Sequence, residues 1–355
     1  MNSVSESYKN NPLHLKHIIP LDFKTALKLP DSHAWTLPDH PMADPLTHAA
    51  VPVIDLCSPQ AATLIRQACE KWGAFQVTNH GIPIKLLNQV EFQTRRLFAL
   101  PANQKLLAGR SPEDFTGYGL PRFSTFFSKL MWTEGFTIMG SPLDHARQLW
   151  PHEYDHINFC QVMVEYQKEL KGLAEKILGL MFRSLGLTQE DIAWFKPKYG
   201  SKSPQGVLQL NSYPVCPDPN RAMGLAPHTD SSLLTSLYQG NTSGLQVYRD
   251  NVGWVPVHPV SGALVVIVGD LMQITCNGRF KSALHRALVN NTRHRISTAY
   301  FYGPPQDVKI SPSAKLTDHD HPILYRPVTW REYLDAKATH FNKAIELIRY
   351  DASSC

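Results

Sequence analysis

The sequence predicts an α+β fold in which a double-stranded β-helix, or jelly roll, is buttressed by helices from both ends of the chain. Two observations carry this prediction. From residue 206 to residue 311, short β segments recur about every ten residues and are separated by Pro, Gly and Asn turns, which is typical of jelly rolls and closed barrels. On either side of this stretch, apolar residues recur at helical spacing instead.

The composition is that of a globular protein rather than a disordered one. Of the 355 residues, 43% are hydrophobic and 18% are charged. The 35 Lys and Arg residues against 30 Asp and Glu residues give a net charge of +5 without a basic run, which argues against nucleic-acid binding but tolerates a small carboxylate ligand. Six scattered cysteines without a CxxC pair argue against a disulfide scaffold and a zinc knuckle.

Nothing in the sequence predicts export or insertion into a membrane. The first twenty residues lack the continuous apolar stretch of a signal peptide. The longest apolar run, 263–268, is far short of a membrane span, which needs about 20 residues. We therefore expect a cytoplasmic protein with no nucleic-acid, membrane or obligate protein partner.

We expect one compact unit built from four stretches. Residues 1–50, rich in Pro and His, predict an irregular arm that wraps on the rest of the chain. The stretch 51–200 predicts an α/β region that packs on the core, and 201–311 predicts the jelly roll itself. Residues 312–355 predict a C-terminal helical segment.

The elements of the N-terminal region follow from their periodicity. Strands are expected over 51–56 and 74–78, a helix over 61–73 between them, and a second helix over 84–99. The stretch 115–151, called the aromatic stretch below, is dense in aromatic, Gly and Pro residues and shows no period. This is typical of loops that carry function.

Further along the chain, a long amphipathic helix over 158–185 and a short helix near 188–195 complete the helical part. The chain ends in a helix over 330–349. Between them, the expected strand segments are VLQLNSY, LLTSLYQ, LQVYR, WVPVH, ALVVIVG, MQITC, SALHRALV, ISTAYFYG and VKIS.

Three residues of the jelly roll have the chemistry of a metal site. His228 and Asp230 are two positions apart at the start of an expected strand, so both side chains project from one face. His285, within SALHRALV, adds a second imidazole. Two histidines and one carboxylate form the facial triad of non-haem Fe(II) oxygenases, but zinc hydrolases use the same donors, so these residues alone leave the metal open.

Arg295 and Ser297 form a second pair ten residues further along. We predict that an odd loop at 290–292 joins two hairpin strands, so that this pair shares a face with His285. A guanidinium fork and a hydroxyl beside an open-sided metal would take the end of a dicarboxylate through parallel hydrogen bonds. The pair therefore favours iron with such a cosubstrate.

Together these residues resemble the plant 2-oxoglutarate- and Fe(II)-dependent dioxygenases. The motifs that carry the resemblance are His228-x-Asp230, His285, Arg295-x-Ser297 and LQLNSYPVCPDP, with VPVIDL, WGAF and NHG in the N-terminal region.

The resemblance implies roles for particular residues. The expected Fe(II) ligands are His228, Asp230 and His285, and no residue beyond them is given a catalytic role. The expected partners of the distal carboxylate of 2-oxoglutarate are Arg295, Ser297 and Tyr213, and Asn211 is expected near the metal end of this cosubstrate.

Within this family, the chain resembles the gibberellin 3-oxidases. The segments that carry this closer resemblance are MWTEGFT and GSP in the aromatic stretch, then RAMGL, GLQV with RD, and ATHFNKA near the C-terminus. It implies hydroxylation of a gibberellin precursor, a diterpenoid acid, at the 3β position to give a bioactive gibberellin. Fe(II), 2-oxoglutarate and O2 are then required, ascorbate supports the activity, and succinate and CO2 are the co-products.

The aromatic stretch supplies the expected substrate pocket. A partner for the substrate carboxylate is expected from Arg122 or Lys129. The alternative for each residue is that it packs this stretch onto the barrel. The expected apolar contacts are Phe123, Phe126, Phe127, Met131 and Trp132.

Three other functions stay open at this point. A related oxygenase could perform gibberellin 20- or 2-oxidation, or flavonoid oxidation. A metal-dependent hydrolase would need no 2-oxoglutarate and would work with zinc. A non-catalytic hormone-binding jelly roll is the third alternative, and the complete triad argues against it.

Overall fold

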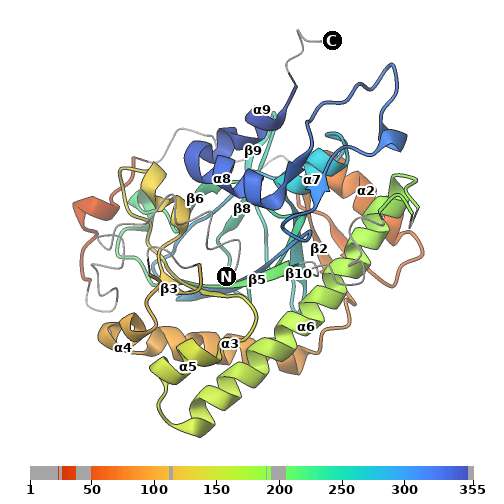
Figure 1. Ribbon diagram of the computed structural model, residues 1–355. Helices are drawn as coiled ribbons and strands as arrows, with labels where there is room; N and C mark the ends of the chain where they lie inside the picture. Colours follow the sequence, from red (N-terminus) through yellow and green to blue (C-terminus); the bar gives the residue numbers. More distant parts are fainter. Residues whose placement is uncertain are drawn as a thin grey trace.

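Most of the described strands form two facing sheets (Figure 1), and the last two strands pair with each other in a third. A cavity lies between the two larger sheets. The computed structural model describes residues 23, 26–36, 49–111, 115–188, 190–192 and 205–350. The strands are β1 (Val53–Asp55), β2 (Ala74–Thr78), β3 (Gly117–Gly119), β4 (Glu134–Ile138), β5 (Gln205–Tyr213), β6 (Leu225–His228), β7 (Leu234–Tyr238), β8 (Leu245–Arg249), β9 (Gly253–Pro256), β10 (Leu264–Val268), β11 (His285–Ala287), β12 (Arg295–Gly303), β13 (Lys309–Ile310) and β14 (Val328–Thr329).

Helices surround these sheets. The α-helices are α2 (Ala61–Lys71), α3 (Ile84–Ala99), α4 (Ala102–Leu107), α5 (Leu143–Leu149), α6 (Glu153–Ser184), α7 (Asp270–Thr275), α8 (Trp330–His340) and α9 (Ala344–Ile348). The 3-10 helices are η2 (Asp31–His33), η3 (Arg122–Phe126), η5 (Pro219–Arg221), η6 (Ala314–Leu316) and η7 (Phe341–Lys343).

The two sheets have the arrangement of a jelly roll. Within the described residues, the larger sheet has eight strands in the order β1-β2-β10-β7-β12-β5-β4-β3, and the smaller has four in the order β6-β11-β8-β9. The predicted fold class, a jelly-roll core with flanking helices, is confirmed.

Alternate residues of the central strands face the cavity and the helices in turn. Along β5, Val207, Gln209, Asn211 and Tyr213 line the cavity. The alternate residues point the other way, where Leu208 and Leu210 join the main apolar core. This period of two is what a strand with two buried faces requires.

The main apolar core lies between the larger sheet and the helices α2, α3 and α6. The 32-residue α6 packs against β5, β7 and β12, and Tyr166 on α6 shares a hydrogen bond of 2.9 Å with Thr298 Oγ1 on β12. The helices α8 and α9 lie on the opposite side of the sheets from α3, α5 and α6 (Figure 1). Both ends of the chain therefore contribute to holding the sheets together.

The N-terminal region does more than pack on the core. The strands β1 and β2 extend the larger sheet at one end, and β4 and β3 extend it at the other. The strand β4 lies within the aromatic stretch, which the sequence predicts as loops, and pairs with β5 from Glu134 opposite Ser212 to Ile138 opposite Leu208.

Two helical segments differ from the sequence prediction. MQITC, predicted as a strand, lies in α7 and its end, because a short buried apolar run does not distinguish a helix from a strand. The predicted C-terminal helix is interrupted, since α8 ends at His340 and Phe341 has a φ of 50°. This left-handed value ends the helix.

The predicted hairpin between His285 and Arg295 is wrong. The strand β11 pairs with β6 and β8 in the smaller sheet, whereas β12 pairs with β5 and β7 in the larger one. The connection 288–294 therefore crosses from one sheet to the other. His285 and Arg295 still line the same cavity, but from different sheets.

Part of the predicted N-terminal arm lies against the aromatic stretch. Trp35 donates its indole N–H to the Leu130 carbonyl at 2.8 Å and its backbone N–H to the Arg221 carbonyl at 2.7 Å. The rest of the arm and most of the helix predicted near 188–195 lie outside the described residues. Across the described ranges, no helix is long and apolar enough to cross a membrane.

Gly269, between β10 and α7, is expected to be intolerant of a side chain. A Cβ there would lie 2.1 Å from the Ser232 carbonyl oxygen, so Gly269→Ala should lower the free energy of unfolding by about 1–3 kcal/mol. Gly172 in α6 has nothing within 4 Å of such a Cβ, and Gly172→Ala should raise the free energy of unfolding by about 0.5–1 kcal/mol. Urea unfolding of both variants measures the difference, and equal midpoints would contradict this packing.

Candidate metal and cosubstrate site

A cavity of about 540 Å³ lies between the two sheets. Residues of β5, β7, β10 and β12 line it from the larger sheet, and residues of β6, β8 and β11 line it from the smaller sheet. The helices η3 and α8 complete the lining. Mostly apolar walls with a few convergent polar groups are typical of a small-molecule site.

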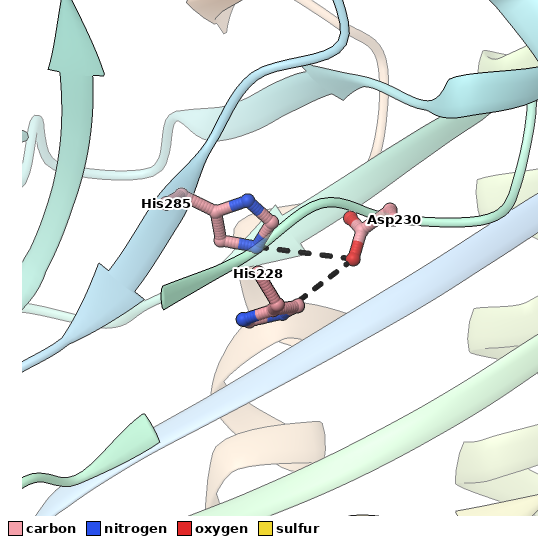
Figure 2. Close-up of side chains that lie close together, drawn as sticks. All are labelled: His228, Asp230 and His285. Atoms are coloured by element: carbon pink, nitrogen blue, oxygen red, sulfur yellow. Dashed lines mark ion pairs between the residues drawn. The ribbon is translucent and has the colours of Figure 1, made fainter. Parts of the chain in front are cut away.

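His228, Asp230 and His285 converge at one point of the cavity wall (Figure 2). The antiparallel pairing of β6 with β11 places His228 opposite His285. Asp230 Oδ1 lies 3.6 Å from His228 Nε2 and 3.8 Å from His285 Nε2. All three side chains are buried, and the atoms that could bind a metal lie within 4.8 Å of one another. These three residues are called the metal cluster below.

One detail of this cluster differs from the sequence prediction. His228 ends β6 instead of opening a strand, and Asp230 comes from the loop that follows. The chain leaves the sheet after His228, and the Asp230 carboxylate approaches the two imidazoles from this loop.

Backbone carbonyls orient both imidazoles. His228 Nδ1 lies 2.8 Å from the Ala226 carbonyl oxygen, and His285 Nδ1 lies 3.0 Å from the Ala283 carbonyl oxygen. Because a carbonyl can only accept, each Nδ1 carries a proton, and Nε2 is the ring nitrogen that faces the cluster. Burial, and next the nearby His285, lower the pKa of His228 well below its ordinary value, so this imidazole is in the neutral form that binds metal ions.

A hydrogen bond from Thr235 orients the Asp230 carboxylate. Thr235 on β7 donates its hydroxyl to Asp230 Oδ2 at 2.6 Å. The other carboxylate oxygen, Oδ1, is the one that faces both histidines. The larger sheet thus orients a ligand that belongs to the loop after β6.

Arg295 and Ser297 face the cavity region from the larger sheet. In the ladder of β12 with β5, Arg295 lies opposite Tyr213 and Ser297 lies opposite Asn211, so the four side chains share a face. Arg295 Nε donates to the Thr242 carbonyl at 3.3 Å. Among the described residues, the two Nη atoms of Arg295 and the Ser297 hydroxyl have no hydrogen-bond partner, although each side chain is buried.

This guanidinium is suited to an anionic ligand. Burial lowers the pKa of Arg295, and Tyr213, whose ring centroid is 4.8 Å from Cζ, partly offsets the effect. A buried charge without a counter-ion costs several kcal/mol. A carboxylate would satisfy both Nη atoms through parallel hydrogen bonds, so the residues present fit a dicarboxylate beside the metal cluster.

The aromatic stretch contributes only part of the predicted pocket. Arg122, Phe123 and Phe126 line the cavity. The Phe123 ring also stacks on the His228 imidazole with centroids 4.8 Å apart. Phe127 is not among the lining residues and packs against Trp35, with ring centroids 5.3 Å apart.

Three other predicted pocket residues also lie outside the cavity lining. Lys129 points to the N-terminal arm, where Nζ donates to the Asp31 carbonyl at 2.7 Å. Met131 packs in a small apolar cluster with Met223. Trp132 is fully buried and donates Nε1–H to the Pro214 carbonyl at 3.1 Å. For Met131 and Trp132, packing in the apolar interior accounts for their character.

Sequence reasoning missed several residues of the cavity wall. Arg110 lies beside the pocket and donates to Thr137 Oγ1 at 3.0 Å. Lys337 and Phe341 come from α8 and η7, more than 100 residues after His228. No local pattern relates such distant positions, although Phe341 lies in ATHFNKA, a segment that carries the closer family resemblance.

Two family models match the chain. The model of the 2OG-Fe(II) oxygenase superfamily matches residues 204–304, which contain all three residues of the metal cluster. The chain belongs to the 2OG-Fe(II) oxygenase superfamily. The model described as non-haem dioxygenase in morphine synthesis N-terminal matches residues 51–155 of this oxygenase.

Curated relatives and solved structures cover nearly the whole oxygenase. Gibberellin 3-beta-dioxygenase 3 of Arabidopsis thaliana is 52% identical over 98% of this chain and 100% of its own length. Gibberellin 3-beta-dioxygenase 1 of Pisum sativum is also 52% identical, over 98% of this chain and 94% of its own. A crystal structure of JOX2 in complex with 2OG, Fe and JA has a TM-score of 0.81 at 29% identity and covers 94% of this chain and 98% of its own.

The protein is therefore an enzyme, a dioxygenase that depends on Fe(II), 2-oxoglutarate and O2. The two imidazoles and one carboxylate fit Fe(II), since they are the donors of a facial triad with open positions. The unpartnered Arg295 and Ser297 groups fit a dicarboxylate cosubstrate.

Thr235→Val is expected to weaken metal binding. The change keeps the shape of the side chain but removes the hydroxyl that holds Asp230, and loss of such outer contacts typically lowers metal affinity about 10- to 100-fold. Anaerobic titration with Fe(II) by calorimetry measures the effect. Ser236→Ala is the matched control, because that neighbouring hydroxyl has no partner among the described residues; a Thr235→Val affinity equal to that of the control would contradict the role of Thr235.

Proposed function

We propose that this dioxygenase hydroxylates a gibberellin precursor at the 3β position to give a bioactive gibberellin, with succinate and CO2 as co-products. The observation that carries the proposal is the 52% identity, along nearly the full chain, to gibberellin 3-beta-dioxygenases of two plants. The cavity of about 540 Å³, with largely apolar walls beside the metal cluster, suits a rigid hydrocarbon skeleton.

In this proposal, His228, Asp230 and His285 hold Fe(II). Their side chains approach from β6, β11 and the loop after β6, which leaves the cavity side of the metal position for other ligands. The bound iron supplies the activation of O2. The protein orients both imidazoles through the Ala226 and Ala283 carbonyls.

Arg295 and Ser297 would take the distal carboxylate of 2-oxoglutarate. The two Nη atoms and the hydroxyl offer donors that have no partner among the described residues. Tyr213 and Asn211, opposite them on β5, would complete this end of the site, with Asn211 toward the metal end of the cosubstrate. The cosubstrate would then span the cavity from the larger sheet to the metal cluster.

The aromatic stretch and the C-terminal segment would hold the substrate. Phe123 and Phe126 of η3 stack on Phe341, with ring centroids 5.3 and 5.1 Å apart. These rings supply an apolar wall that orients the substrate and excludes water from the reacting carbon. Arg122, which also lines the cavity, would pair with the substrate carboxylate.

We also propose that the enzyme acts in the cytosol without an obligate protein partner. The five described cysteines, Cys57, Cys69, Cys160, Cys216 and Cys276, are free, which supports a reducing compartment. Microscopy of a fluorescently tagged chain tests the location.

The reaction is tested by product analysis. The purified chain is incubated anaerobically with Fe(II), 2-oxoglutarate and one of a panel of gibberellin precursors, and O2 is then admitted. The proposal expects succinate and 3β-hydroxylated product in equal amounts. Product hydroxylated only at another carbon would overturn the substrate assignment, and the absence of succinate with every precursor would overturn the proposed reaction.

Arg295→Lys is expected to raise the Kd for 2-oxoglutarate about tenfold or more, because one ammonium cannot replace two parallel hydrogen bonds to a carboxylate. Equilibrium titration of the metal-loaded enzyme measures the Kd. Arg293→Lys, at an exposed position two residues earlier, is the matched control and should leave the Kd unchanged. Equal Kd values for the two variants would remove Arg295 from the cosubstrate site.

Arg122→Gln is expected to raise the KM for the gibberellin precursor about tenfold through loss of a charge-assisted hydrogen bond. Lys129→Gln removes a charge seven residues away, at a side chain that bonds the N-terminal arm instead. It should leave this KM unchanged. Steady-state kinetics with saturating 2-oxoglutarate compares the variants, and an unchanged KM for Arg122→Gln would exclude Arg122 from the pocket.

A further inference from the structure

Among the strands that the structure describes, the one that carries His228 lies at the edge of its sheet. The order of the smaller sheet is β6-β11-β8-β9, so within the described part of the chain β6 has a strand partner on one side alone. Backbone groups on the other side of an edge strand need partners from elsewhere or from water. Beyond His228, the chain leaves the sheet and Asp230 follows in a loop. Few hydrogen bonds between strands therefore hold this end of β6.

Asn342 supplies partners at this edge. Its Nδ2 donates to the Pro227 carbonyl at 3.2 Å, and its Oδ1 accepts from the Thr229 backbone N–H at 3.3 Å. In a parallel sheet, a residue bonds the carbonyl before and the N–H after the residue opposite it. The side-chain amide of Asn342 thus takes the place of a parallel strand residue opposite His228.

Lys337 reaches the same segment through the side chain of Thr229. Its Nζ donates to Thr229 Oγ1 at 2.5 Å and to Asp270 Oδ2 at 2.7 Å. The Thr229 hydroxyl in turn donates to the same Asp270 oxygen at 3.1 Å. Asp270 also donates its backbone N–H to the Asp230 carbonyl at 2.7 Å, so the loop that carries the carboxylate ligand is held at two consecutive residues.

Further contacts make Asp270 a rigid centre. It is 1% exposed and accepts hydrogen bonds from Tyr333 on α8 at 2.7 Å and from Ser282, three residues before His285, at 2.6 Å. Fully satisfied buried polar networks of this kind restrict the conformations of the groups that they join. One carboxylate therefore links α8 to the segments of all three residues of the metal cluster.

The helix break at Phe341 brings Asn342 to this position. Phe341 adopts a left-handed φ of 50°, which is unfavourable for a bulky residue and persists only where the surroundings fix it. Its ring is held by the stacks with Phe123 and Phe126. The packing of the aromatic stretch thus determines where the amide that follows is presented.

We propose that Asn342 and Lys337 are positioning residues that hold the His228–Asp230 segment in the geometry for metal binding. The inference rests on the metal role proposed above for this segment. Neither residue is a metal ligand. Asn342 acts through the Pro227 carbonyl and the Thr229 backbone N–H, and Lys337 acts through the Thr229 hydroxyl. Because Lys337 and Phe341 also line the cavity, one C-terminal segment borders the substrate and supports the metal ligands.

The test measures metal binding rather than turnover. The full-length protein is titrated with Mn(II), a redox-stable probe, without 2-oxoglutarate, and thermal unfolding of the metal-free protein is recorded for each variant. Asn342→Ala removes both hydrogen bonds, and Asn342→Asp replaces the donor with an oxygen that faces the Pro227 carbonyl. Each should raise the Kd for Mn(II) about tenfold, the lower end of the range for outer-shell contacts. Lys343→Ala, the exposed neighbour, should leave the Kd unchanged.

Lys337→Met tests separately whether the C-terminal segment supports the His228–Asp230 segment. It keeps the aliphatic stem but removes the ammonium from Thr229, and the Kd for Mn(II) should rise in the same direction. This variant carries the prediction if the Asn342 variants do not fold.

The outcomes separate the inference from the function on which it rests. A lower melting temperature of the metal-free variants with the wild-type Kd for Mn(II) would indicate a purely structural role and would overturn the inference. Failure of the wild-type protein to bind Mn(II) would instead overturn the metal role of the three-residue cluster.

Discussion

The pairing of β6 with β11 is the contact on which the site depends. It sets His228 opposite His285 across two strands of the smaller sheet, while Asp230 and its partner Thr235 connect this cluster to the larger sheet. The dicarboxylate position proposed at Arg295 belongs to the larger sheet, through the pairing of β12 with β5. A reaction that needs both groups therefore requires the two sheets to keep a fixed separation, which the helices on either side of them help to maintain.

Two cations near the metal cluster, the buried Arg295 and the partly exposed Lys337, differ in their electrostatic setting. Lys337 is neutralised by Asp270 at 2.7 Å, so its charge is used within the protein to hold neighbouring segments. Arg295 has no carboxylate partner among the described residues, and its Nη atoms are unsatisfied. Since an uncompensated buried charge is costly, the fold stores at Arg295 a preference for an anion that Lys337 does not have.

Residue type and spacing pointed to side chains that the fold brings together, but not to the pairing of strands. His228, Asp230, His285 and Arg295 line one cavity, and Ser297 shares the face of Arg295 on β12. The predicted hairpin was wrong, because periodicity reveals which residues share a face and not which distant strand becomes the neighbour. For the same reason Lys337 and Asn342 were missed, and Trp132 was assigned to a pocket when its indole packs inside the barrel wall.

The amide of Asn342 also has a consequence for association between molecules. It occupies the Pro227 carbonyl and the Thr229 N–H, the two groups on the free edge of β6 to which a strand from another molecule would bond in parallel at His228. Exposed strand edges are templates for intermolecular pairing, and natural proteins cover or shorten them. A side chain from the end of the chain thus closes part of an edge that would otherwise favour aggregation.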